Sequence, residues 1–322
     1  MKPVDVYYHS LLEAMRLDNK KESYVKRSLS DLRVFDRWLD QRVPDDRFTS
    51  EKVAELSQDD YKEFIGALKN SYTDASINRI CTVVTKLLQH HEVKYTFRIQ
   101  DLLETPKSFP LKKKDFISDK EYQKLIDTFY SSENVPDAFL SAHKELAERN
   151  VSMIMLMRLY GLSGAQISKI CMRDINFSDD QLTIHHQDGQ DITYTLSLEH
   201  KRLIYSYLLK IPENRRPWFK SEHPLFVAYN NQHMMYQYDN DNQVPKRLAE
   251  RSIIKLLQVE VMRADLRPIS ATNLRNRAIL DYLVAGYSDP ETMKYFAMDY
   301  RHTLRRYRKY LESQKNKSNY LH

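Results

Sequence analysis

Residues 148–177 read ERNVSMIMLMRLYGLSGAQISKICMRDINF, and no other stretch says as much about the fold. The apolar run Met153–Leu159 is too short to span a bilayer and is typical of a helix in a protein core. Gly161 then marks a turn, a short helix follows, and Asp174 and Ile175 lead into a β-prone region. The stretch therefore predicts a buried helix that turns sharply into a second, shorter helix.

The composition is that of a helical globular protein. The chain has 322 residues, 42% apolar and 29% charged, which is enough to bury the cores of two domains. It contains only 5 glycines and neither a GxGxxG nor a GxxxxGK[ST] loop, so no nucleotide cofactor is expected. Cys81 and Cys171 lie in apolar helical patterns without metal-ligand spacing, which predicts buried thiols and no metal site. With no signal-peptide pattern and no membrane-length apolar run, a reducing cytoplasm is expected.

A small helical domain is predicted in residues 1–103. Ser57, with Asp60 three residues later, has the pattern of a capping box at the start of a helix. Asp74 or Ser76 is predicted to cap the next helix. The amphipathic helices of this domain are expected at residues 23–40, 57–70 and 73–93.

Residues 104–116, ETPKSFPLKKKDF, predict an interdomain linker, because they contain two prolines, a lysine triplet and no periodicity. Lys112, Lys113 and Lys114 have two interpretations of equal weight. Either they solvate a flexible strap, or the strap lies along a polyanion.

Residues 117–322 predict a second domain that is mainly helical with one β-hairpin. Two β-prone runs, QLTIHH and ITYTLSL, flank QDGQD, whose Asp188–Gly189 pair is a strong hairpin signal. His185 and His186 are interpreted as solvated, because adjacent strand residues point to opposite faces and do not share a metal. Residues 230–243 predict a polar loop. Helices are predicted at 117–130, 142–161, 198–210, 245–264 and 270–286 and in the basic C-terminal segment.

This order of elements resembles that of the tyrosine recombinases, the phage-integrase and Xer-like family. The resemblance covers residues 20–310 and rests on four local matches. It implies a mainly α-helical tyrosine-recombinase fold. Residues 1–103 would form a SAM-like core-binding domain, and residues 117–322 a larger catalytic-like domain with a small β-hairpin.

Two of the matches replace residues that the family uses in catalysis. Ser163 stands at the family's first catalytic arginine, and Gln166 stands at the glutamate three positions later. The family's hairpin lysine, which protonates the leaving oxygen, is matched by Gln187. No lysine lies between Lys169 and Lys201 to take its place.

The other two matches retain an arginine and a tyrosine. The His-x-x-Arg box reads TNLR here, so Arg275 is kept while Thr272 replaces the histidine, and Asn276 follows where the family often has His or Lys. The Leu-Gly-His segment reads FAM, with Met298 at the histidine. Tyr307, nine residues later, stands at the nucleophilic tyrosine.

These replacements bear directly on strand cleavage. Attack of a tyrosine on a phosphodiester places negative charge on the phosphorane oxygens, which the family's arginines and histidines stabilise. Loss of one such donor costs about a hundred- to a thousandfold in rate, so several losses leave little catalysis. The resemblance implies a vestigial site and no enzymatic activity, with Arg275 contacting the DNA backbone instead. The vestigial positions are Ser163, Gln187, Thr272, Arg275, Met298 and Tyr307.

A net charge of +6 favours a polyanionic partner, because each neutralised phosphate releases counterions. The family's equivalent of the helix at 73–93 enters a major groove. Asn78 and Arg79 are base-reading candidates there, since asparagine reads adenine and arginine reads guanine. The alternative is that half of the cations merely solvate their helices. The expected DNA contacts are Lys26, Arg27, Asn78, Arg79, Lys86, Lys112, Lys113, Lys114, Arg247, Arg251, Arg275, Arg301, Arg305 and Arg306.

The resemblance therefore implies a protein that holds double-stranded DNA in a C-shaped clamp without cutting it. The simplest function for such a DNA-binding protein is that of a transcriptional repressor, cytoplasmic and nucleoid-associated. The sequence resembles the integrase-fold lysogeny repressors of temperate SPbeta-type Bacillus phages. A divergent active recombinase and an architectural protein that bridges DNA sites stay open as alternatives. So do the roles of residues 311–322, which would dock in cis, dock in a neighbouring subunit of a homo-oligomer, or be disordered.

Overall fold

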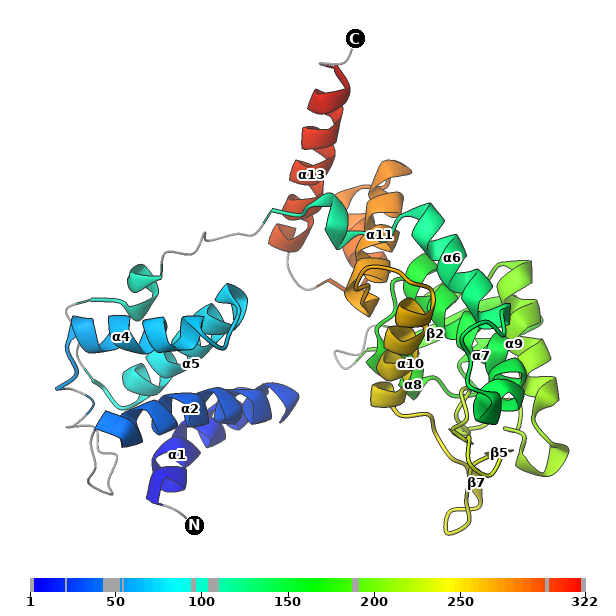
Figure 1. The fold of residues 1–322 in the computed structure, drawn as a ribbon, viewed down its shortest axis with the longest axis horizontal. Coiled ribbons are helices and arrows are strands. Elements are labelled where there is room, and N and C mark those ends of the chain that lie inside the picture. Colours follow the sequence, from blue (N-terminus) through cyan, green and yellow to red (C-terminus); the bar gives the residue numbers. More distant parts are fainter. Residues whose placement is uncertain are drawn as a thin grey trace. The chain divides into compact units, whose positions relative to one another are not determined.

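The computed structural model divides the chain into two compact units, residues 1–109 and 110–322 (Figure 1). It describes residues 3–20, 22–42, 53, 55–93, 97–103, 110–186, 191–298 and 301–319. Within these ranges helices predominate, as the sequence predicts, and all strands belong to the second unit. None of the described helices is long and apolar enough to cross a membrane.

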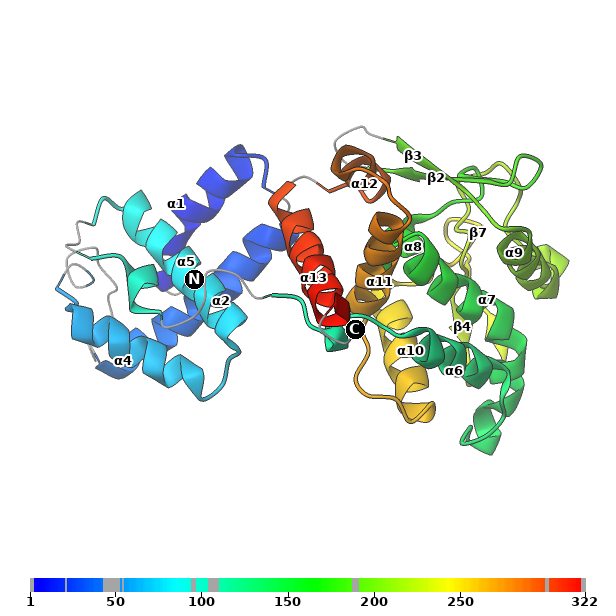
Figure 2. The same cartoon turned by 90° about the horizontal axis from the view of Figure 1, so that it is seen from above.

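The first unit contains an α-helix that was not predicted from the sequence. This helix, α1, buries Tyr8, Leu11, Leu12 and Met15 in a cluster shared with α2 and α5. Figure 2 shows α1, α2 and α5 lying side by side in this unit. The described elements of the unit are α1 (Pro3–Leu17), α2 (Glu22–Arg42), α4 (Gln58–Lys69), α5 (Asp74–His90) and the 3₁₀ helix η1 (Ile99–Leu102).

The predicted helix caps of the first unit are partly confirmed. Ser57 caps α4 through a capping box, in which the Asp60 carboxylate accepts from the Ser57 backbone N–H at 2.8 Å. The prediction of Asp74 or Ser76 as the cap of α5 is wrong, because Thr73 is the N-cap and its hydroxyl accepts from the Ser76 backbone N–H. Thr73 has the extended backbone that an N-cap needs, whereas Asp74 and Ser76 are already helical.

The core of the first unit is aromatic. Phe35 and Trp38 of α2 meet Phe64 of α4, with a ring-centroid distance of 5.1 Å between Phe35 and Phe64 in an edge-to-face arrangement. Cys81 of α5 is buried in the same cluster, and this burial raises the pKa of its thiol to about 12. Cys81 is therefore an unreactive core thiol.

The second unit begins with residues that the sequence analysis placed in the linker. Leu111 and Phe116, on either side of η2 (Lys113–Asp115), are buried in a cluster that also contains residues of α11 and α13. Residues 104–109 lie outside the described residues. The remaining helices are α6 (Asp119–Tyr130), η3 (Asp137–Phe139), α7 (Leu140–Leu159), α8 (Gly164–Lys169), α9 (Leu198–Lys210), η4 (Glu213–Arg215), α10 (Glu250–Arg263), α11 (Ala271–Val284), α12 (Asp289–Tyr295) and α13 (Arg301–Asn319).

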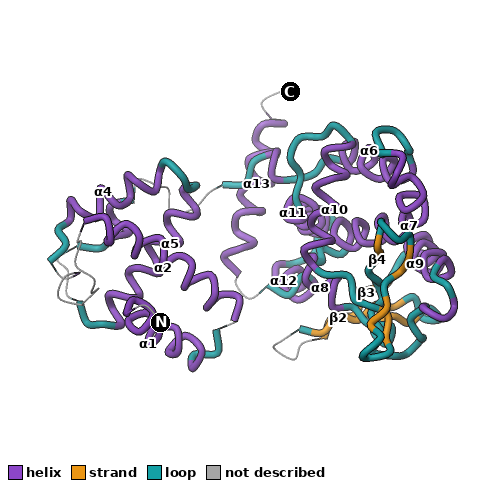
Figure 3. Tube along the Cα trace, turned by 60° about the horizontal axis from the view of Figure 1, so that its bottom comes forward, coloured by secondary structure: helices purple, strands orange, loops and turns teal. Residues whose placement is uncertain are grey.

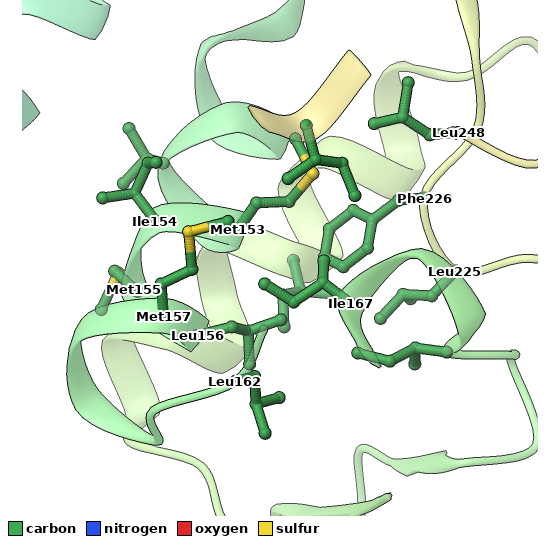
Figure 4. Packing of buried hydrophobic residues seen from close by; sticks show 14 of the residues in the cluster. Met153, Ile154, Met155, Leu156, Met157, Leu162, Ile167, Leu225, Phe226 and Leu248 are labelled. Atoms are coloured by element: carbon green, nitrogen blue, oxygen red, sulfur yellow. The ribbon is translucent and has the colours of Figure 1, made fainter. Parts of the chain in front are cut away.

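Helix α7 is the centre of the second unit, as its apolar run predicts. Every residue from 151 to 158 is buried, which suits a helix that is covered on all sides. Figure 4 shows Met153 and Leu156 packed with Ile167 of α8 and with Phe226. The turn between α7 and α8 is therefore anchored in the main core.

The predicted hairpin is present as part of a three-stranded antiparallel sheet (Figure 3). In the register of β2 and β3, Leu182 lies opposite Tyr194 and Ile184 opposite Ile192, and all four are buried. The other residues of these strands alternate with them on the more exposed face. The turn residues 187–190 lie outside the described part of the chain. The strands are β1 (Ile175–Asn176), β2 (Gln181–His185) and β3 (Asp191–Thr195).

Residues 230–243 are more ordered than the predicted polar loop. Two short antiparallel ladders lie in and beside this segment. Tyr236, in one of them, is buried in the core, and its hydroxyl donates to the Glu145 carboxylate at 3.2 Å. An anchored aromatic residue fixes the chain on both sides of it. The ladders are β4 (Tyr229–Asn230) with β5 (Met235–Tyr236) and β6 (Tyr238–Asp239) with β7 (Val244–Pro245).

Candidate functional site

The candidate site begins at the turn between α7 and α8. Gly161 has a φ of +65°, a conformation that favours glycine, and it lets the chain reverse directly after α7. A Cβ atom at this position would lie 2.7 Å from the ring of Phe296. The turn is therefore packed directly against the segment that follows α12.

Ser163 and Gln166 bond to each other at the start of α8. The Ser163 hydroxyl accepts from the Gln166 backbone N–H at 3.2 Å, and Oε1 of Gln166 accepts from the Ser163 backbone N–H at 2.9 Å. This capping box satisfies two backbone donors that the helix start leaves unpaired. Ser163 and Gln166, which were matched from the sequence to a catalytic arginine and glutamate, thus have a shared structural role here.

Arg275 of α11 holds the same turn from the other side. Its guanidinium donates to the carbonyl oxygen of Phe296 at 2.6 Å and to the carbonyl oxygen of Gly161. The guanidinium carbon lies 5.8 Å from the centroid of the Phe296 ring. Burial lowers the pKa of Arg275, and the nearby Tyr194 and Tyr307 partly offset this shift. The phosphate contact expected from the sequence would compete with both carbonyl bonds.

Tyr307 of α13 points into the protein. Its hydroxyl donates to Oδ1 of Asn276 at 2.6 Å, and Nδ2 of Asn276 donates to the carbonyl oxygen of Asp115 at 2.9 Å. Tyr307 is 5% exposed, and burial raises the pKa of its hydroxyl to about 12. Its ring packs edge-on against Phe116. From the sequence, Asn276 is only a replacement, because its partner Tyr307 lies 31 residues away.

Of the remaining positions matched to the family from the sequence, Thr272 and Met298 lie among the described residues. Thr272 is exposed in the first turn of α11. Met298 is half-buried and packs against the cluster that contains Leu304 and Tyr307. Gln187 lies outside the described residues. A hydrogen bond joins the hairpin to this region, since the Tyr194 hydroxyl of β3 donates to the carbonyl oxygen of Tyr295 in α12 at 2.8 Å.

The candidate DNA contacts of the first unit fall into two groups. Lys26, Arg27 and Asn78 are exposed on α2 and α5. Arg79 instead forms a bidentate ion pair with the buried Asp31, with N–O distances of 2.8 and 3.0 Å. Lys86 donates to the Tyr24 hydroxyl at 3.0 Å. The ion pair orients the guanidinium of Arg79, whose side chain is still 40% exposed.

In the second unit, most of the candidate cations are exposed. They are Lys112, Lys113, Lys114, Arg251, Arg305 and Arg306.

Arg247 differs from these exposed cations. Its Nη1 donates to the carbonyl oxygens of Ser168 at 2.6 Å and Ile170 at 3.1 Å, and its Nη2 contacts Sγ of Cys171 at 3.1 Å. Arg247 therefore fixes the chain after α8, and a phosphate contact would compete with these bonds. The side chain of Arg301 lies outside the described residues.

The two hairpin histidines differ, because His185 is exposed, as the sequence predicts, whereas His186 is half-buried. His185 lies between two carboxylates, 3.2 Å from Asp174 and 2.9 Å from Asp191, and the Asp191 hydrogen bond is the largest cause that raises its pKa. Nε2 of His186 is buried without a hydrogen-bond partner. Among the described residues, no three His, Cys, Asp or Glu side chains form a cluster suited to a metal ion.

Comparison with known proteins identifies the fold. No protein-family model matches the chain, and no curated protein matches it by sequence. Solved structures do match. The XerH site-specific recombinase bound to a palindromic difH substrate gives a TM-score of 0.66 at 13% identity, covering 97% of this chain and 82% of that chain. The Tn1549 transposon integrase, residues 82–397, in complex with a circular-intermediate DNA gives 0.63 at 11% identity, covering 95% of each chain.

A third match agrees with these two. The lambda integrase dimer, residues 75–356, bound to a COC′ core site gives a TM-score of 0.61 at 13% identity and covers 94% of each chain. The chain therefore has the tyrosine-recombinase fold, as predicted from its sequence.

Proposed function

We propose that this protein binds duplex DNA in a sequence-specific manner and does not cleave it. The fold supports the first half, because the XerH, Tn1549 and lambda proteins that share it were all solved on DNA. The net charge of +6 and the exposed cations of both units agree with a polyanionic partner. The chemistry of the site supports the second half.

The single observation that carries the loss of cleavage is the state of Arg275. This arginine is the retained cation of the family's pattern, and its guanidinium is already bonded to two backbone carbonyls. Ser163 and Thr272, at two other positions where the family has cationic or proton-donating side chains, are neutral. A phosphorane that formed near Tyr307 would lack the oriented donors that make such catalysis fast.

Tyr307 itself is poorly placed to act as a nucleophile. Attack needs an accessible hydroxyl that can lose its proton, whereas the Tyr307 hydroxyl is buried and donates that proton to Asn276. With its pKa raised to about 12, the phenolate form is scarce at neutral pH. These features favour a structural tyrosine over a reactive one.

A protein that occupies DNA without cutting it suits transcriptional control. We assign it the role of a repressor, in a prophage that maintains lysogeny, acting in the cytoplasm on the nucleoid. This step rests on analogy between folds. The DNA contacts assigned to this role are the exposed cations Lys26, Arg27, Lys112, Lys113, Lys114, Arg251, Arg305 and Arg306, together with Asn78 and Arg79 as base readers.

A nicked suicide DNA substrate tests the proposal, because it traps any covalent tyrosine–DNA product. The DNA sequence comes from genome-wide occupancy mapping of the protein. Tight binding without a covalent adduct, and occupancy at promoters, support the repressor. An adduct that disappears in Tyr307→Phe establishes a divergent recombinase instead. Footprints only at paired half-sites away from promoters indicate an architectural protein.

A further inference from the structure

A cavity of about 560 Å³ lies in the second unit, between α7, α10 and the chain around β4. Its volume is within the range of roughly 300–1,000 Å³ that small-molecule sites occupy. None of the positions matched to the family's catalytic residues that the structure describes lines it. Its apolar wall is formed by Phe139, Leu146, Leu248, Leu256 and Val259, and of these Phe139 and Val259 are about half exposed (45% and 49%), where the cavity meets solvent.

The cavity is also lined by Arg149, a buried arginine of α7 that is only 4% exposed. Its Nε and Nη2 donate to Oδ1 of Asn150 at 3.1 and 3.0 Å, and its Nη1 donates to the carbonyl oxygen of Val227 at 2.9 Å. A guanidinium carries five N–H donors, so two of them have no acceptor among the described residues. Both acceptors of Arg149 are neutral.

Buried charges in proteins are normally paired, and Arg149 has no carboxylate partner among the described residues. Glu145, one turn earlier on α7, accepts the Tyr236 hydroxyl instead. Burying the unpaired charge of Arg149 therefore costs folding free energy. A ligand that brings a negative charge would offset that cost.

The charges around the cavity point in the same direction. Glu260 is the single carboxylate among the lining residues, and it pairs with Arg263 at 2.6 Å. Burial lowers the pKa of His143, which lies beside this pair, and so disfavours a positive charge on its ring. Arg149 and Lys255 remain as lining cations without a carboxylate in the described structure.

We propose that this cavity binds a small organic anion that joins a carboxylate to an apolar tail. The carboxylate would accept the two remaining N–H donors of Arg149, since a planar carboxylate matches the guanidinium fork. The tail would lie against Phe139, Leu256 and Val259. The proposal does not rest on the repressor assignment and stands whether or not that assignment does.

Competition binding on the full chain tests this site. The fluorescent anion 1-anilinonaphthalene-8-sulfonate reports occupancy of the cavity. Octanoate and octanamide, its neutral counterpart of the same length, are each titrated to displace the dye. Octanoate is expected to displace the dye at concentrations about tenfold lower than octanamide, because a charged hydrogen bond adds to the same apolar burial. Equal potency of the two competitors, or no displacement by octanoate, overturns the proposal.

Two exposed positions on α10 provide matched variants that keep the core intact. Val259 lines the cavity, whereas Met262, which is 79% exposed on the same helix, does not. Val259→Glu brings a like charge to the cavity and is expected to weaken octanoate binding about fivefold. Met262→Glu makes the same charge change elsewhere and is expected to leave binding unchanged. Equal effects of the two variants place the octanoate outside the cavity and overturn the proposal.

Arg149→Gln addresses the buried cation directly. In a folded variant, confirmed by its circular dichroism, the preference for octanoate over octanamide is expected to disappear while octanamide binds as before. A preference that persists without the Arg149 charge contradicts its assigned role. If this variant does not fold, the comparison of Val259→Glu with Met262→Glu still decides the matter.

Discussion

The hydroxyl of Tyr307 donates a 2.6 Å hydrogen bond to Oδ1 of Asn276, and both side chains are buried. Asn276 in turn donates to the backbone of Asp115, so one amide joins α13 and α11 to the start of the second unit. The hydroxyl of Tyr307, which was matched from the sequence to the recombinase nucleophile, therefore helps to hold the second unit together.

Tyr307→Phe is therefore expected to lower stability rather than DNA affinity. Removing the hydroxyl leaves Oδ1 of Asn276 buried without a donor, which costs about 1–3 kcal/mol. Urea denaturation measures the loss, and DNA titration at fixed salt measures the affinity. Tyr310→Phe is the control, since Tyr310 is a half-buried neighbour on the same helix. A Tyr307→Phe protein of unchanged stability would contradict this structural role.

Arg275→Met is expected to destabilise the protein without changing the salt dependence of DNA binding. The change removes the donor of the Gly161 and Phe296 carbonyls, at about 1–3 kcal/mol for each buried acceptor left unpaired. Arg251→Met, on the exposed face of α10, makes the matched change. It is expected to leave stability alone and to reduce the slope of log affinity against log salt by about 1.

The contrast between these two arginines also decides between two interpretations of Arg275. If it contacts a phosphate, as the sequence analysis expected, Arg275→Met reduces the salt slope as Arg251→Met does. If it supports the turn at Gly161, only the unfolding transition shifts.

Ser163→Ala is expected to lower stability by about 1 kcal/mol, the usual effect of removing an N-cap side chain. Ser163→Thr keeps a capping hydroxyl and is expected to restore most of the loss. Thermal or urea unfolding of the three proteins measures both effects. Identical stability of the alanine and wild-type proteins would show that the bonds of the Ser163 hydroxyl contribute nothing.

How far the sequence alone predicts this structure can be seen around that cap. The turn at Gly161, the short helix after it and the hairpin strands are local patterns, and all three are confirmed. Gly161, a partner of Arg275, lies 114 residues away along the chain, and Asn276, the partner of Tyr307, lies 31 residues away. No local sequence pattern indicates either contact. For the same reason the ion pair of Arg79 with Asp31, 48 residues away, was invisible to helix periodicity.

The same limit applies to the cavity beside α10. Arg149 lies in the stretch that decides the fold, yet the sequence analysis assigned it no role. Its unusual feature is a buried charge without a carboxylate, which is a property of the packed structure. Composition and periodicity do not carry that information.

Arg79 is expected to discriminate between bases. Removing it alone leaves Asp31 as a buried carboxylate without its partner, so the change is made in an Asp31→Asn background, with Asp31→Asn alone as control. If Arg79 reads a guanine, its replacement by alanine costs about 1–3 kcal/mol on the specific site and little on random DNA. Equal weakening on both DNAs would make Arg79 a phosphate contact.

Alkaline pH is expected to unfold the second unit through its buried tyrosines. Burial raises the pKa of Tyr194, Tyr207 and Tyr307 to about 12, above the value of 10.0 for an exposed tyrosine. The unfolded chain therefore loses these protons first. The stability that the neutral hydroxyls provide is complete below pH 10 and is lost as the pH rises from there toward 12.

Urea midpoints measured from pH 8 to pH 11 test this expectation, with a steady decline beginning near pH 10. Tyr307→Phe removes one of the contributing groups, so its decline above pH 10 is expected to be shallower than that of the wild-type protein, although its stability at pH 8 is lower. Parallel declines would mean that the Tyr307 hydroxyl reaches solvent in the native protein. That accessibility is what a nucleophile requires, and it would revive the case for strand cleavage.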